Sequence, residues 1–388
     1  MRNEVMKYRK EISWQVTWKR SLISLFSFLI ILLLLTACSS SDDTEGTEKR
    51  QAMLTVYVYS PEHPLLIRSD VGNVDASADE TKITRLQIWI FTNGTHEKVA
   101  YLDTDDTSML NVGEGTAYQL PVSEEFVRNK PDVDVYVMAN LPDGEFGNTL
   151  VEESTRQQIL DAKIPETAFG LTNYAIPAKG LPMTGSLTAQ PVVGEAPVLR
   201  VGTTSNIATV RLVRAVSKVR FVFANTVGAD PLYIKKITLD ESVIPNEEYL
   251  IQQTRTLETG WNAASTLWEN ETGIEVEKVE NPTTYIYGGQ EASVYEKLIN
   301  DDVNAGKLTM IDPFYLRESD KKLKGTITYQ LGENEKQGRF EMDAAGDFRR
   351  NHTWIVYAYH AGGGFLQMNA IYIKDWTNVS ASHEVYNW

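Results

Sequence analysis

The chain has 388 residues, of which 42% are hydrophobic and 23% charged, and its formal net charge is −15. This composition is typical of a globular protein long enough for two domains, and it excludes a disordered chain. The acidic balance argues against a nucleic-acid-binding protein, because phosphate contacts need clustered Lys and Arg.

The N-terminal segment has the opposite charge to the rest of the chain. Six basic and two acidic residues give the first twenty residues a charge of +4, which leaves −19 for the remainder. An apolar run of roughly seventeen residues follows and ends in the sequence "LTAC". These features predict a secretory signal peptide over residues 1–37. An uncleaved transmembrane anchor is the alternative, because the run is at the lower limit of spanning length.

The sequence "LTAC" resembles a bacterial lipobox, in which the cysteine is lipidated on its sulfur and becomes the first residue of the mature chain. Cys38 is the only cysteine, so it cannot form an internal disulfide or a thiolate metal site. Residues 38–51 are rich in Ser, Asp and Glu and predict an acidic tether. Such a stretch resembles the signal that exports surface lipoproteins of Gram-negative bacteria. We therefore expect a cell-surface precursor, anchored in the outer membrane by acyl chains on Cys38.

Segments of alternating apolar and polar residues dominate the chain from residue 51 onward. They are rich in Val, Ile, Tyr, Phe and Trp and are separated by Gly, Asn, Asp and Pro, a pattern that predicts antiparallel sheets. We therefore expect an all-β fold of antiparallel β-sandwich domains. The predicted strands are residues 53–60, 85–93, 133–142, 208–225, 233–240, 324–331, 352–360 and 365–376.

Few segments predict helix. The best is "STRQQILDAKI", in which Ser154 and Gln157 have the spacing of a capping box. A weaker helix is expected near 291–303.

A stretch rich in Pro, Gly and Thr, residues 188–206, precedes the long predicted strand. We place the boundary between two β-domains near residue 207. The predicted domains are therefore residues 52–207 and 208–388.

The sequence contains no recognisable catalytic or metal-binding motif. Five histidines lie in separate segments, and His352 and His360, at the two ends of one predicted strand, would be about 25 Å apart. Asp103, Asp105 and Asp106 resemble the start of a calcium loop, but Ser108 occupies the position that needs glycine. A solvated turn is the simpler interpretation.

Other sequence signals for catalysis are equally weak. The sequence "AGGGF" lacks the Lys and Ser or Thr of a phosphate loop and predicts a hairpin turn. The chain has no GxSxG motif, and its one cysteine is assigned to lipidation. We expect no enzyme activity, no cofactor and no metal, and therefore a structural or binding role.

Several local patterns follow one another along the chain: the lipobox, "LTVYVYS", "RLQIWIFTNG", "VYVMANLP", "GLPMTG", "VRLVRAVSKVRFVF", "FYLRES", "RRNHTWIVYAYH" and an ending "IKDW…YNW". In this order they resemble the fimbrillins, subunits of the type V pili that Gram-negative anaerobes build from secreted lipoproteins. The resemblance covers nearly the whole chain. It implies two tandem transthyretin-like antiparallel β-sandwiches with minor short helices. It also implies donor-strand exchange, in which an arginine-specific protease removes the first strand and another subunit's strand fills the groove.

The resemblance assigns residues 52–68 as the removable first strand and its loop. Cleavage would fall between Arg68 and Ser69, shortly before the next predicted strand. An ordinary loop arginine is the alternative reading of Arg68, and a cut after Lys49-Arg50 would open no groove. The side chains expected on one face of the removable strand are Leu54, Val56 and Val58.

The resemblance also assigns residues 377–388 as the candidate donor segment. By alternation, Val379, Ala381 and Val385 point to one side, and Trp388, the last residue, points to the other. The alternative is that this tail is the last strand of the second domain.

The sequence therefore predicts a structural subunit of a cell-surface pilus, or fimbria, that supports adhesion. Its expected partners are other pilus subunits in a homo- or heteropolymer, the outer membrane through the lipid on Cys38, and a host or bacterial surface receptor. One alternative is a non-polymerising anchor or tip subunit of the same pilus. Another is a surface glycan-binding lipoprotein of β-sandwich modules that uses Trp and Tyr to stack on sugars, and a secreted hydrolase ranks behind both.

Overall fold

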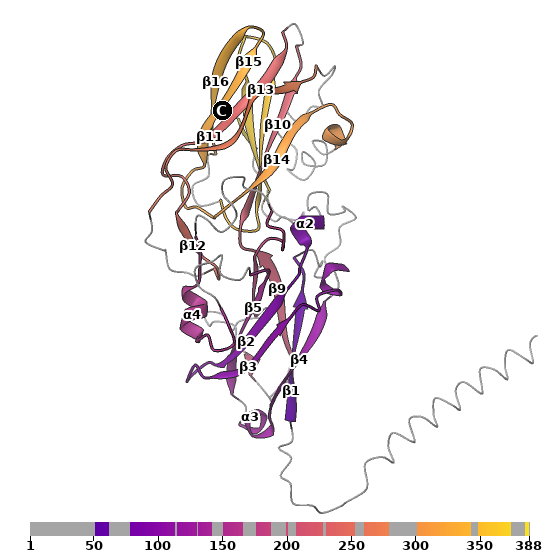
Figure 1. The fold of residues 1–388 in the computed structure, drawn as a ribbon, viewed down its shortest axis with the longest axis vertical. Helices are drawn as coiled ribbons and strands as arrows, with labels where there is room; N and C mark the ends of the chain where they lie inside the picture. Colours follow the sequence, from indigo (N-terminus) through magenta and orange to yellow (C-terminus); the bar gives the residue numbers. More distant parts are fainter. Residues whose placement is uncertain are drawn as a thin grey trace, which may run out of the picture. The chain divides into compact units, whose positions relative to one another are not determined.

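The computed structural model describes a chain built mainly of β-strands (Figure 1), which confirms the expected all-β class. Contacts group Arg50–Trp388 into one compact unit. No helix within the described part of the chain is long and apolar enough to cross a membrane. The described residues are 51–61, 78–112, 115–129, 131–141, 150–165, 176–187, 199–200, 207–227, 230–252, 260–278, 301–342, 348–373 and 385–387.

The first sheet has eight strands, seven of which follow the order β3-β2-β5-β7-β9-β1-β4, while β8 pairs with β5. Its neighbours pair antiparallel, with the exception of β1 and β9, which run parallel. The strands are β1 (Gln51–Tyr59), β2 (Leu86–Thr92), β3 (Lys98–Thr104), β4 (Thr116–Ser123), β5 (Asp132–Ala139), β7 (Met183–Leu187), β8 (Leu199–Arg200) and β9 (Ile207–Arg214).

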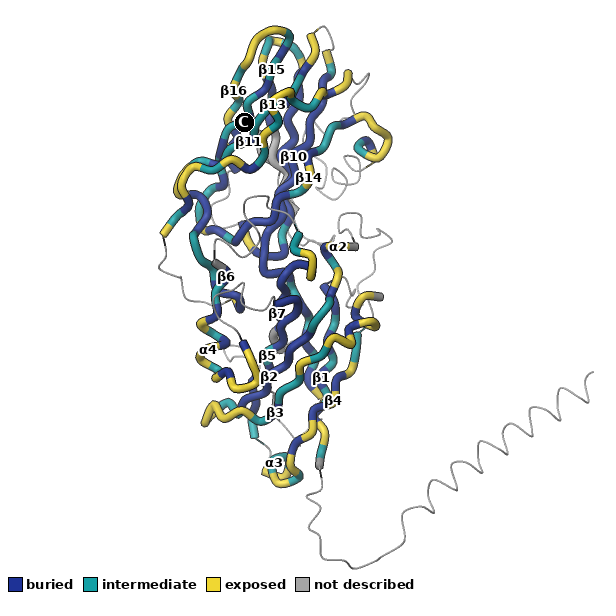
Figure 2. Tube along the Cα trace, viewed as in Figure 1, coloured by how far each residue is buried: buried dark blue, intermediate teal, exposed yellow. Residues whose placement is uncertain are grey.

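The first sheet contributes one face to a single hydrophobic core. Every second residue of β4 and β9 is buried, as the alternating sequence requires. Side chains of β1, β2, β4, β5 and β9 meet in this core, so strands from both sides of β7 enclose it as the layers of a first sandwich. Figure 2 shows that most of β2 and β5 is buried. The core includes Leu54, Val56, Val58, Leu86, Ile88, Ile90, Tyr118, Leu120, Val122, Val133, Val135, Val137, Val210 and Leu212.

Two further sheets form a second sandwich. One has the order β14-β10-β17-β18-β19 and the other the order β13-β11-β15-β16, and both contribute to one core that includes Phe221, Trp354, Ile237 and Ile327. The strands are β10 (Ser217–Asn225), β11 (Leu232–Leu239), β13 (Ser265–Val276), β14 (Thr309–Leu316), β15 (Lys324–Leu331), β16 (Asn334–Glu341), β17 (Thr353–His360), β18 (Gln367–Ile373) and β19 (Val385–Asn387).

The single strand predicted over 208–225 is wrong. It is two strands, β9 in the first sheet and β10 in the second. Ala215 and Val216, between them, are fully buried in a third apolar cluster that includes Leu181, Leu250 and Tyr315. The chain therefore changes sheet at this buried joint and not near residue 207, because β9 completes the first sheet. The division of the chain into two domains stays a prediction, since the contacts of Arg50–Trp388 form one unit.

The helices of the described residues are short. The expected helix is α4 (Arg156–Asp161), but its capping box is formed by Thr155 and Gln158. The expected Ser154 instead accepts a hydrogen bond from the backbone of Val151 at 2.9 Å. The weaker helix near 291–303 lies mostly outside the described residues, although 301–304 are helical. The other elements are α2 (Ala78–Thr81), α3 (Glu124–Arg128), the 3-10 turn η1 (Leu110–Val112), and the strand pair β6 (Lys163–Pro165) and β12 (Glu247–Tyr249).

The "AGGGF" segment forms the expected hairpin turn between the antiparallel strands β17 and β18. Gly362, Gly363 and Gly364 all have positive φ, at 102°, 75° and 76°. L-residues rarely adopt this conformation, so the turn depends on glycine.

Candidate functional site

The strand β1 lies in the interior of the first sheet, between β9 and β4 (Figure 1). It pairs with β4 from Gln51↔Ser123 to Val58↔Thr116, and with β9 from Thr55↔Ile207 to Tyr59↔Arg211. Both β4 and β9 come later in the chain than β1, and the segments that connect them to β1 are too long for a hairpin. We call the space that β1 fills between β9 and β4 the β1 slot. Without β1, both strands would present unpaired backbone groups to this slot.

The two faces of β1 differ in burial. Leu54 and Val56 are each 1% exposed and Val58 is fully buried, and all three belong to the core of the first sheet. Met53, on the opposite face, is 44% exposed. The β1 slot is therefore open to the core on one side, and it accepts branched apolar side chains at every second position.

The end of β1 leads into the proposed processing loop. The Pro61 carbonyl accepts a hydrogen bond from Arg211 Nη2 at 2.9 Å. Residues 62–77, which include Arg68 and Ser69, lie outside the described residues, as do Lys49 and Arg50. The chain is described again from α2. Cleavage between Arg68 and Ser69 therefore stays a prediction, and so does lipidation of Cys38, which also lies outside the described residues.

The candidate donor segment is described only at β19. Its backbone pairs antiparallel with β18, from Val385↔Ile371 to Asn387↔Asn369, at one edge of the five-stranded sheet. This is the arrangement of the alternative reading, in which the tail is the last strand of its own domain. Val379, Ala381 and Trp388 lie outside the described residues, and the donor role stays a prediction.

Charged residues hold the joint between the two sandwiches. Glu80 of α2 is 1% exposed, and its Oε1 lies 2.9 Å from Lys218 Nζ of β10. The same oxygen accepts a hydrogen bond from the Tyr315 hydroxyl of β14. The Glu80 carbonyl accepts a bond from Arg214 Nε of β9 at 3.0 Å. The sequence alone did not reveal this cluster, although Arg214 and Lys218 stand at buried positions of the "VRLVRAVSKVRFVF" segment and therefore needed partners.

A second buried cluster centres on Arg350. Its guanidinium binds Glu318 Oε1 at 2.7 Å and donates to the carbonyls of Tyr249 and Leu250 at 2.7 and 2.6 Å. Glu248 of β12 lies 3.7 Å from the same guanidinium. Burial, with a smaller contribution from the nearby Glu318 and with Arg350 opposing both, raises the pKa of Glu248 to about 7. The "FYLRES" and "RRNHT" segments therefore build the joint.

The segments "VYVMANLP" and "GLPMTG" also meet. Asn140, with φ 59°, donates to the carbonyls of Lys82 and Leu181 at 2.7 and 2.8 Å and accepts from the Thr84 backbone at 2.8 Å. A Cβ on Gly180 would lie 2.5 Å from the Lys82 carbonyl oxygen, so glycine is required there. Both segments therefore have a structural role.

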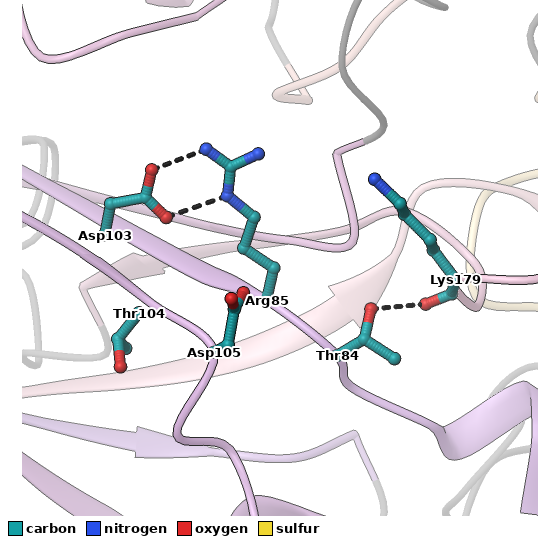
Figure 3. Close-up of a pocket in the computed structure, with 6 residues that line it drawn as sticks. All are labelled: Thr84, Arg85, Asp103, Thr104, Asp105 and Lys179. Carbon is teal, nitrogen blue, oxygen red and sulfur yellow. Dashed lines mark hydrogen bonds and ion pairs between the residues drawn. The ribbon is translucent and has the colours of Figure 1, made fainter.

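A polar surface pocket lies at the start of β2 and the end of β3 (Figure 3). Arg85 holds Asp103 through Nε–Oδ1 and Nη2–Oδ2 contacts of 2.8 and 2.5 Å. These hydrogen bonds lower the pKa of Asp103, which is therefore a paired carboxylate and poorly suited to transfer a proton. Thr84, Thr104, Asp105 and Lys179 also line the pocket.

The calcium reading of Asp103, Asp105 and Asp106 gains no support. Arg85 already occupies both oxygens of Asp103. Across the residues that the structure describes, no group of three or more His, Cys, Asp or Glu side chains could hold a metal ion.

No protein-family model matches this chain, and no curated protein matches it. Several solved structures are similar to this chain at low identity. A fimbrial assembly protein from Parabacteroides distasonis is 13% identical, with a TM-score of 0.47, over 87% of this chain and 100% of that protein. The tip fimbrial protein Mfa3 from Porphyromonas gingivalis is 12% identical, with a TM-score of 0.42, over 87% and 100%. The fimbrial anchor protein Mfa2 from the same organism is 11% identical, with a TM-score of 0.39, over 87% and 98%. At this low similarity, the function proposed below depends on the chain's own strands.

Proposed function

We propose that this chain is a structural subunit of a cell-surface pilus, in which β1 of the precursor is removed and a strand of another subunit replaces it. The observation that carries the proposal is the position of β1. It is the first strand of the described chain, it lies inside a sheet, and it continues into the rest of that sheet only through residues 62–77. One cut in this segment would leave β1 held by noncovalent contacts alone.

An empty β1 slot would be a strong acceptor for another strand. The unpaired edges of β9 and β4 can form main-chain hydrogen bonds to an extended segment on both of its sides. Burying three branched apolar side chains in place of Leu54, Val56 and Val58 contributes roughly 5 to 9 kcal/mol gross, at about 1.5 to 3 kcal/mol each. Ordering a flexible donor offsets part of this.

The remaining steps of the proposal rest on the predictions made from the sequence. The precursor is lipidated on Cys38 and anchored in the outer membrane, and a protease cuts between Arg68 and Ser69. The tail, with Val379, Ala381, Val385 and Trp388, serves as the donor strand for a neighbouring subunit. The chain works by assembly and adhesion, without catalysis or a cofactor, and its partners are other pilus subunits and a surface receptor.

The decisive experiment compares residues 69–388 with residues 51–388 in purified form. Filaments should form from the shorter chain and be visible by electron microscopy, while the longer chain stays monomeric because its own β1 fills the slot. A synthetic peptide of residues 51–61 should block filament growth, and a scrambled peptide of the same composition should not. A 69–388 chain that stays monomeric and binds no peptide would rule out the proposal. On cells, the surface form should begin at Ser69.

The glycan-binding alternative has less support. Sugar stacking needs exposed aromatic rings, and among the described residues Phe365 is the one aromatic in the set of exposed large hydrophobic side chains. Charged and hydroxyl side chains line the pocket of Figure 3, with no aromatic platform.

A further inference from the structure

We propose that Glu80 is a positioning residue that keeps α2 docked after the precursor is cut, while β1 leaves. This inference rests on the proposed function. The cut chain begins at Ser69, and its first described element is α2. A helix of four residues has little stability of its own, so side-chain contacts must hold it.

The contacts that hold α2 come from strands that stay in place. Glu80 Oε1 binds Lys218 Nζ at 2.9 Å and the Tyr315 hydroxyl, and the Glu80 carbonyl binds Arg214 Nε at 3.0 Å. These partners belong to β10, β14 and β9. None of these three contacts involves β1, so they can all persist when β1 is removed.

The upstream side of the loop is held in a different way. There, Arg211 Nη2 binds the Pro61 carbonyl, and Pro61 directly follows β1. This hydrogen bond is lost when β1 leaves. The cut therefore divides the loop into two parts. The part before the cut is continuous with β1, whereas the part after it leads into α2, which the contacts of Glu80 hold.

Glu80 also connects α2 to both sandwiches. Arg214 is the last residue of β9, which lines the β1 slot, whereas Lys218 and Tyr315 belong to the five-stranded sheet. Downstream of α2, Asn140 holds the Lys82 carbonyl and the Thr84 backbone. Residues 80–84 therefore remain tied to the body from both sides.

The cut changes how much these contacts matter. In the intact precursor, residues 62–77 connect α2 to β1. An α2 that detaches therefore stays tethered close to its docking position and rebinds easily. After the cut, α2 lies near a free chain end, where fraying is common. Loss of the Glu80 charge removes the carboxylate that lies 2.9 Å from the buried Lys218 ammonium, which is unfavourable. Glu80→Gln should therefore free α2 mainly in the cut chain.

The test uses the full chain after its signal peptide, with a recognition sequence for a site-specific protease inserted between Arg68 and Ser69. Cut and uncut samples are digested briefly with a lysine-specific protease, and mass spectrometry follows cleavage after Lys82, which is exposed. Glu80→Gln should speed this cleavage about tenfold or more in the cut chain and less than about threefold in the uncut chain, since cleavage tracks the open population. Asp79→Asn, an exposed change in the same helix, should change neither rate.

Two further variants keep the test decisive. Tyr315→Phe removes one hydrogen bond and keeps the ion pair, so it should give a smaller increase in a chain that still folds. Lys218→Met combined with Glu80→Gln should be no worse than Glu80→Gln alone, because the two residues act as one pair. Equal Lys82 cleavage in wild type and Glu80→Gln after the cut, or an equal increase in both samples, would overturn the inference. Failure of the cut chain to exchange β1 for added peptide would instead count against the proposed function.

Discussion

Glu248 is the residue whose charge state links solution conditions to the joint between the sandwiches. Its carboxyl faces Glu318, Arg350 and Arg317, and burial is the largest of the effects that raise its pKa from 4.5 to about 7. The folded chain therefore binds a proton there that the unfolded chain has released. The stability from this group is fully present below pH 4.5 and is lost as the pH rises toward 7.

We therefore predict that the Glu248 contribution to the unfolding free energy of residues 51–388 falls between about pH 4.5 and 7, by up to about 3 kcal/mol. Urea unfolding at a series of pH values measures it. Glu248→Gln removes the titrating group and should flatten this part of the pH profile, and Glu247→Gln on the same strand is the control. Identical pH profiles of wild type and Glu248→Gln would contradict the prediction.

At the scale of the element, burial alternates along β1, and this alternation allows a direct test of its register in the first sheet. Val56 faces the core with 1% exposure, whereas Thr55, its neighbour, lies on the half-buried opposite face. Val56→Asp should lower the unfolding free energy of residues 51–388 by about 3 kcal/mol or more, because it buries an unpaired carboxylate. Thr55→Asp should cost less than about 1 kcal/mol. Chemical denaturation measures both values, and equal costs would place β1 in a different register.

The sequence predicted those strands that alternate and lie inside sheets, such as β2, β5, β11 and β17. It missed β3, β13 and β16, which carry polar residues and lie at sheet edges. Edge strands commonly carry charge, which hides the apolar pattern. The strand β4 alternates clearly and could have been found.

Local sequence patterns could not locate two element boundaries, the junction of β9 with β10 and the start of α4. The apolar signal continues through Ala215 and Val216, because the joint there is as buried as the strands on either side. Periodicity therefore could not show that the chain changes sheet. At α4, Ser154 and Thr155 each have a Gln three residues later, and the structure selects Thr155 as the cap.

At the scale of the whole molecule, the tail decides how subunits connect. Within the described residues, β19 adds three pairs to the edge of its sheet. Deleting residues 377–388 from the 51–388 chain should therefore leave a folded protein, with little change in the midpoint of thermal unfolding. The same deletion in the 69–388 chain should abolish filaments under the electron microscope. Filaments that persist would show that another segment is the donor.

Pairs between distant segments explain what the sequence could not provide. The burial of Arg214, Lys218 and Arg350 indicates that these residues have partners. The partners Glu80 and Glu318, however, belong to segments distant in sequence from the residues that they contact. The position of β1 between β9 and β4 is equally non-local. The all-β class could therefore be predicted, whereas the β1 slot and the joint required the three-dimensional structure.

The parallel pairing of β1 with β9 also has a consequence for how the chain folds. Pro61 and Arg211, which bond at the end of β1, are 150 residues apart. Contacts so distant in sequence form slowly, because a long loop must close first. Of the described strands, β1 emerges first from the ribosome, but it cannot be enclosed on both sides until β9 arrives. We therefore expect each molecule to pass through a state with a half-formed slot during its own folding, before any protease acts.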